Sequence, residues 1–304
     1  MQVGRKVFAI AAALASLACA GLWHYWGGPG ESAALSSTAD KSSGKDERGQ
    51  RGLLEKTDLG PQRPASGDVW ALADHRKASS SFAEAISKAE AGDVVAQRTV
   101  ADFYSRCSLY SLSPSKFSST LDTFARLRGE EPNAYDGLKR RMKATCGEVD
   151  GGRPIPRDLY FYWYERAARQ GDAYSRVALA SFNYQMLTPK DVRMIGQDVI
   201  NAGDPEAIFA LGDLLAIAPE GSAVGDHRPV ASPYANLAWG IVACRMGADC
   251  GPGSFRMDAL CMNTGVCDAG DFEQAVRSDM VPTGQQELLD KAIREVQNIV
   301  GSSN

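Results

Sequence analysis

A Gly-Asp pair that recurs three times constrains the fold of this chain more than any other feature. The copies begin at Gly92, Gly171 and Gly203. In each copy a small residue follows the glycine after four positions, and a large apolar residue follows after eight. Positions four and eight apart share one face of a helix, so each copy predicts a helix with an apolar stripe. The glycine ends the preceding helix, and the aspartate caps the next one.

A helix pair of this kind leaves apolar surface uncovered, and neighbouring pairs bury it by stacking. We therefore predict an all-α fold over 68–304, a superhelical solenoid of antiparallel helix pairs, because no segment alternates polar and apolar residues as a strand would. A capping box, Thr283 with Gln286, opens the last helix. The expected helical segments are 68–91, 94–106, 114–145 (a degenerate pair with a helix starting at Pro132), 158–170, 173–186, 189–202, 205–218, 233–246, a short helix around Leu260, and 283–300.

Residues 1–26 predict a signal anchor or a signal peptide. Arg5 and Lys6 precede an uncharged run, Val7 to Trp26, which as a helix spans roughly 30 Å and is long enough to cross a bilayer. The aromatic residues that close the run favour a retained anchor. Two alternatives stay open: cleavage after the small-x-small triplet Ala18-Cys19-Ala20, and lipid attachment at a weak lipobox that ends at Cys19.

The next segment, 27–67, is rich in Gly, Ser, Pro and mixed charge, and it predicts a disordered linker that acts as a tether. The rest of the chain is then exported. We expect it on the periplasmic side of a bacterial cell envelope, anchored in the inner membrane, or alternatively secreted or lipid-anchored.

The charge balance argues against nucleic acid as a partner. The formal net charge is −4, whereas a nucleic-acid-binding domain carries a basic stripe. One basic run, Lys139, Arg140, Arg141 and Lys143, could contact an anionic lipid or polymer. We interpret it as a solvated helix face.

Six cysteines follow Cys19, and an even number in an exported chain predicts disulfides. A glycine shortly before Cys250 and another before Cys267 suggest tight turns, so we favour local pairs; crossed pairing among the last four stays open. A zinc site is disfavoured because no Cys-x-x-Cys spacing is present. The favoured pairs are Cys107 with Cys146, Cys244 with Cys250, and Cys261 with Cys267.

The segment Trp163 to Asp172 (Trp-Tyr-Glu-Arg-Ala-Ala-Arg-Gln-Gly-Asp) resembles the Sel-one-like repeat, a short relative of the tetratricopeptide repeat. Residues 210–215 match its Leu-Gly portion, and residues 83–104 match more loosely. Residues 235–250 resemble the cysteine-bearing variant of secreted members, in which a bridge closes the loop between helices. The resemblance implies a superhelical stack that binds other proteins, and it implies no chemistry.

Five consecutive aromatic residues, 160–164, occupy one predicted helix. At about 100° per residue they point all round it, so a single core face cannot bury them all. Tyr160, Trp163 and Tyr164 fit the repeat core, which leaves Phe161 and Tyr162 in surplus. Either a neighbouring unit covers these two, the interpretation we favour, or they bind a partner.

The sequence contains no constellation typical of an enzyme. A nucleophile-elbow motif is missing, and the three histidines are scattered. We therefore expect no catalysis and no cofactor. The leading hypothesis is a membrane-tethered periplasmic helical-repeat scaffold that binds an unidentified protein or peptide. The alternatives are an envelope enzyme or enzyme subunit that acts on cell-wall material, and a structural spacer.

Overall fold

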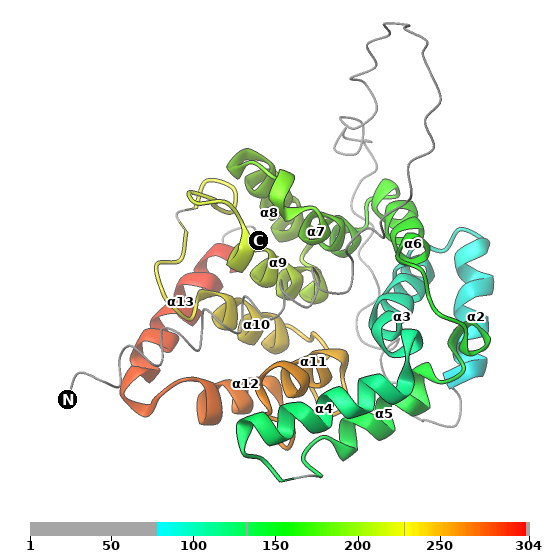
Figure 1. Ribbon diagram of the computed structural model, residues 1–304. Helices are drawn as coiled ribbons and strands as arrows, with labels where there is room; N and C mark the ends of the chain where they lie inside the picture. Colours follow the sequence, from blue (N-terminus) through cyan, green and yellow to red (C-terminus); the bar gives the residue numbers. More distant parts are fainter. Residues whose placement is uncertain (1–77, 132, 228, 302–304) are drawn as a thin grey trace, which may run out of the picture. The chain divides into compact units, whose positions relative to one another are not determined.

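The computed structural model describes residues 78–131, 133–227 and 229–301, all within one compact unit, Lys56–Asn304 (Figure 1). The predicted membrane or signal helix 1–26 and the linker 27–67 lie outside the described residues. Every regular element of the described part is helical, and its one β contact is an isolated bridge between Val224 and His227. The predicted all-α class is therefore confirmed. No helix in the described ranges combines the length and apolar character needed to cross a membrane.

Most helices follow one another through short connections, and the long connection is 218–234, between α9 and α10. The α-helices are α2 (Ala78–Glu90), α3 (Val94–Leu112), α4 (Pro114–Arg128), α5 (Asp136–Cys146), α6 (Arg157–Arg169), α7 (Ala173–Phe182), α8 (Pro189–Ala202), α9 (Pro205–Ile217), α10 (Ala235–Arg245), α11 (Phe255–Thr264), α12 (Phe272–Ala275) and α13 (Gln286–Gly301). The other helical turns are η2 (Val149–Gly152), η3 (Tyr184–Met186), the π-helical η4 (Val276–Met280) and η5 (Thr283–Gln285).

The three Gly-Asp turns form as predicted. The φ angles are 101° at Gly92, 95° at Gly171 and 62° at Gly203, in the left-handed region that glycine adopts without a steric penalty. The aspartate after each glycine caps the next helix, because its carboxylate accepts a hydrogen bond from a backbone N–H of the first turn. The three pairs are Asp93 with Ala96, Asp172 with Ser175, and Asp204 with Glu206.

Several predicted boundaries need correction. Helix α3 continues past the predicted end at Arg106 to Leu112, where Ser113 caps the next helix. Helix α5 begins at Asp136 and not at Pro132.

The capping box proposed at Thr283 is wrong. The side-chain amide of Gln286 donates instead to the carbonyls of Arg277 and Val281, each at 2.9 Å. Thr283 opens the 3-10 turn η5, and Gln286 begins α13. The short elements α12 and η4 were not predicted.

Helices that are close in the sequence are also neighbours in space. Helix α2 packs on α3, α6 on α7, α8 on α9, and α9 on α10. The most extensive contacts between helices that are not consecutive are α3 on α6, α7 on α9, and α10 on α13 (Figure 1). Helices α4 and α5 are inserted in the sequence between α3 and α6, and Lys139 of α5 binds Asp122 of α4.

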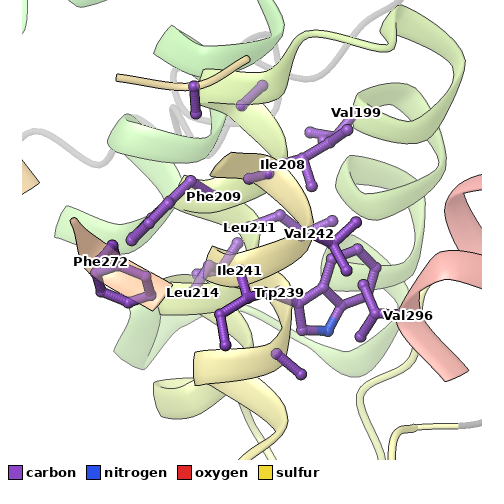
Figure 2. Packing of buried hydrophobic residues seen from close by; sticks show 14 of the residues in the cluster. Val199, Ile208, Phe209, Leu211, Leu214, Trp239, Ile241, Val242, Phe272 and Val296 are labelled. Carbon is purple, nitrogen blue, oxygen red and sulfur yellow. The ribbon is translucent and has the colours of Figure 1, made fainter. Parts of the chain in front are cut away.

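The buried apolar side chains of the described residues form two clusters, one drawn mainly from α2–α6 and one from α7–α13. Trp239 of α10 is 2% exposed and lies near Val296 of α13 (Figure 2). Helix α9 approaches α10 closely at Gly212, where an added Cβ would lie 2.5 Å from the Cβ of Trp239. The glycine of the Leu-Gly pair thus permits the contact between these two helices.

Helix α11 connects the two clusters. Its Met257 and Leu260 belong to the α7–α13 cluster, whereas Cys261 belongs to the α2–α6 cluster. The carboxylate of Asp258, 1% exposed, binds Arg106 of α3 and Arg141 of α5, the latter at 2.7 Å. A segment from the C-terminal third of the chain therefore binds α3 and α5.

The described residues contain three disulfides, and they join the cysteines in the favoured pairs. The bridge between Cys107 and Cys146 fastens α5 to α3, and both residues are at most 2% exposed. The two short bridges, whose partners are 6 residues apart, are Cys244–Cys250 and Cys261–Cys267. Cysteines paired in this way do not supply thiolates to zinc.

Candidate interaction surface

Both surplus aromatic residues, Phe161 and Tyr162, lie on α6, but in different environments. The helix follows Pro156, carries Asp158 in its first turn and has Arg166 and Arg169 in its last turn. This charge distribution interacts favourably with the helix dipole and stabilises α6. The core face of α6 consists of Tyr160, Trp163, Tyr164 and Ala167, all buried.

Phe161 is largely a packing residue. It is half-buried, and its ring centroid lies 4.8 Å from that of Phe182 on α7. The guanidinium of Arg157 covers the ring at 4.5 Å from its centroid. A neighbouring helix therefore contacts Phe161, which is one of the two outcomes considered for it.

Tyr162 is 50% exposed. The guanidinium of Arg166 donates to its hydroxyl at 3.0 Å and lies 5.6 Å from its ring centroid. The same guanidinium lies 5.2 Å from the centroid of buried Trp163. Cation–π contacts of this type fix the position of an arginine side chain on the surface. We call Tyr162 and Arg166 the Tyr–Arg patch.

Arg166 makes no ion pair among the described residues. The nearest acidic residue in sequence, Glu165, binds Arg169 one turn further along α6, at 3.2 Å. The two pairs, Tyr162–Arg166 and Glu165–Arg169, are each four residues apart and share the helix surface. Sequence analysis missed Arg166, although its spacing from Tyr162 is the available signal.

A buried polar network forms where Arg98 of α3 binds the capping residues of two Gly-Asp turns. Asp172 and Asp204 each use one carboxylate oxygen as a helix cap and the other to accept a hydrogen bond from the Arg98 guanidinium, at 3.3 and 2.5 Å. The side chains of all three residues are at most 9% exposed. The caps predicted from sequence therefore also form an ion-pair triad, which was not predicted.

Asp102 extends this network one turn along α3. Its carboxylate accepts a hydrogen bond of 2.6 Å from the hydroxyl of Tyr164 on α6. Burial raises the pKa of Asp102 to about 7, and the hydrogen bond from Tyr164 and the charge of Arg98 offset only part of this effect. Burial also raises the pKa of Tyr164 well above its usual value, with a further contribution from the charge of Asp102. The Arg98 guanidinium thus binds two buried carboxylates and acts through its charge on a third, Asp102. Of the three, Asp102 is the carboxylate whose protonated form is favoured.

A second network holds α11. Arg256 binds Glu206 of α9, and its guanidinium lies 3.6 Å from the ring centroid of Phe209. The other carboxylate oxygen of Glu206 accepts a hydrogen bond of 2.7 Å from the backbone N–H of Asp249. Together with the Asp258 contacts, these bonds fasten α11 to α3, α5 and α9.

The basic run on α5 is only partly a solvated face. Arg141 binds Asp258, and Lys139 binds Asp122 and Asp136. Arg140 and Lys143 are exposed, as predicted. Within the described ranges no group of three or more His, Cys, Asp or Glu side chains could hold a metal ion.

No known protein family, curated protein or solved structure matches this chain. The resemblance to Sel-one-like repeats therefore stays a prediction from the sequence.

Proposed function

We propose that this protein is a helical-repeat scaffold, tethered to the periplasmic side of a bacterial inner membrane, that binds another protein or peptide at the Tyr–Arg patch. The observation that carries the proposal is the half-exposed Tyr162 ring on a helix whose opposite face is buried. Tyr and Arg dominate the binding energy of many interfaces, and a rigid backbone lowers the entropy lost on binding.

The solenoid interpretation is supported by the order of the helix contacts and by the Gly-Asp turns. Arg98 connects the second and third turns through Asp172 and Asp204. The amide of Gln170, beside the second turn, donates to the Gln97 side chain near the first turn at 2.8 Å. Equivalent turns of stacked units are expected to be neighbours in this way.

The proposed location is supported by the three disulfides, because such bridges persist in oxidising compartments outside the cytosol. We assign no reaction to the protein. Asp102, whose pKa is raised to about 7, is 7% exposed and accepts a hydrogen bond from Tyr164, an arrangement that joins helices.

A photo-crosslinking amino acid placed at position 162 in intact cells tests the proposal. Leu288 of α13 is the matched control position, because it is 47% exposed and Tyr162 is 50% exposed. We expect a discrete crosslinked species from position 162 and none from position 288. Crosslinking that is absent at 162, or equal at both positions, would contradict a binding site on α6.

A further inference from the structure

The Tyr–Arg patch combines a fixed cation with an apolar ring and lacks an anion. The guanidinium of Arg166 is held by the Tyr162 hydroxyl at 3.0 Å and by two aromatic rings. Because its position is already restricted, it loses less conformational entropy on binding an anion than a freely rotating arginine does.

The other exposed or half-exposed arginines nearby already have partners. Arg169 binds Glu165, and Arg176 of α7 binds Asp198 of α8 at 2.8 Å. Among the described residues, no carboxylate neutralises Arg166. This excess positive charge beside a half-exposed ring is complementary to a carboxylate that stands next to an apolar side chain.

We propose that the partner of this surface is an acidic peptide segment, in which an Asp or Glu carboxylate binds Arg166 and an adjacent apolar side chain packs on the Tyr162 ring. A carboxylate accepts two parallel hydrogen bonds from a guanidinium, a geometry that an ammonium group cannot reproduce. This inference rests on the proposed protein-binding function and specifies the chemistry of its ligand.

The test is a titration of the full-length protein with a capped hexapeptide that alternates Glu and Leu. The readout is the NMR signal of the Trp163 indole, because the Trp163 ring lies 5.2 Å from the Arg166 guanidinium. The indole of Trp239, which is 2% exposed, serves as the internal reference and should not shift. The same peptide with Gln in place of Glu should bind about tenfold more weakly.

Variants test whether peptide binding depends on Arg166 itself or only on the overall positive charge of the surface. Arg166→Gln should weaken binding of the Glu peptide about tenfold and leave binding of the Gln peptide unchanged. Arg166→Lys keeps the charge but removes the planar guanidinium that stacks on the rings and can donate two parallel hydrogen bonds. We therefore expect about a threefold loss of affinity for the Glu peptide. Arg140→Gln, a change of an exposed arginine on α5, should leave the affinity within about twofold.

Tyr162→Phe provides a second variant in case Arg166→Gln does not fold. It removes only the hydroxyl that holds the guanidinium, and we expect about a twofold to threefold loss of affinity. Equal affinity for the Glu and Gln peptides, an unchanged affinity in Arg166→Gln, or an equal loss in Arg140→Gln would overturn the proposal.

The crosslinking experiment distinguishes the two levels of inference. If position 162 crosslinks to a partner while Arg166→Gln changes neither the crosslink nor the peptide affinity, the acidic ligand is wrong and the scaffold function stands. If the Glu peptide binds through Arg166 but position 162 gives no crosslink in cells, the ligand chemistry is correct and the proposed function fails.

Discussion

The hydroxyl of Tyr164 and the carboxylate of Asp102 lie 2.6 Å apart and join α6 to α3 in the interior of the protein. The carboxylate also lies in the field of Arg98, which already binds two other carboxylates. Burial of this carboxylate, which the hydrogen bond from Tyr164 and the charge of Arg98 offset only in part, raises its pKa and makes the stability of the fold sensitive to pH.

The first prediction is that Asp102 destabilises the protein as the pH rises. Its pKa is about 7 in the folded protein and 3.8 in an unstructured chain, so the folded state holds a proton that the unfolded state has lost. Its contribution is therefore fully present below about pH 4 and is lost as the pH rises towards 7, with a limiting slope of about 1.4 kcal/mol per pH unit.

Asp102→Asn should abolish this component. The free energy of unfolding of the variant, minus that of the wild type, should increase between about pH 4 and pH 7 in denaturant titrations. Asp122→Asn, at a carboxylate that is 49% exposed, is the control. Parallel pH profiles for Asp102→Asn and the wild type would show that Asp102 titrates normally.

The second prediction concerns Arg98. Arg98→Met leaves Asp172 and Asp204 buried without a counter-charge, and we expect a loss of about 3–5 kcal/mol in unfolding free energy. Arg169→Met, at a side chain that is 69% exposed, should change stability by at most about 0.5 kcal/mol. Similar losses in the two variants would mean that the buried triad contributes no more than a surface pair.

The third prediction is that α9 and α10 cannot accept a methyl group between them. Gly212→Ala places a Cβ 2.5 Å from that of Trp239, and the overpacking should cost about 1–3 kcal/mol in thermal or chemical unfolding. Gly284→Ala is the matched control, because its Cβ would meet no atom within 4 Å. A Gly212→Ala protein as stable as the control would show that the two helices separate without penalty.

The fourth prediction ranks the disulfides. Replacing Cys107 and Cys146 with alanine opens a loop between partners 39 residues apart, and the chain-entropy relation gives a loss of about 4 kcal/mol. The same replacement of Cys244 and Cys250, 6 residues apart, should cost about 2 kcal/mol. The midpoints of denaturant unfolding check the order, and a larger loss for the short bridge would contradict it.

The local features of the fold were predictable because short-range chemistry fixes them. A glycine in the left-handed region and an aspartate two or three residues before the backbone N–H that it caps determine each Gly-Asp turn. The local disulfides also followed from nearby glycines. Helix α8 begins and ends at the predicted residues for the same reason, since Thr188 and Gly203 cap its two ends.

The long-range features were not predictable from one sequence. Arg98 and Asp204 are 106 positions apart, and Arg106 and Asp258 are 152 apart, and no local sequence pattern marks these side chains as partners. The return of α11 to α3 and α5 depends on these pairs. At the candidate site, the surplus of aromatic residues on α6 was visible in the sequence. Only the structure, through the exposed fraction of each side chain, distinguished Tyr162 from Phe161.

The dual attachment of α11 sets the order in which the chain can fold during synthesis. An array held only by contacts between adjacent units could consolidate progressively as it emerges from the ribosome. Here Arg106 and Arg141 have no Asp258 to bind, and the α2–α6 cluster lacks Cys261, until α11 has been synthesised. The contacts of the α2–α6 cluster are therefore completed only after the ribosome has released the segment that carries α11.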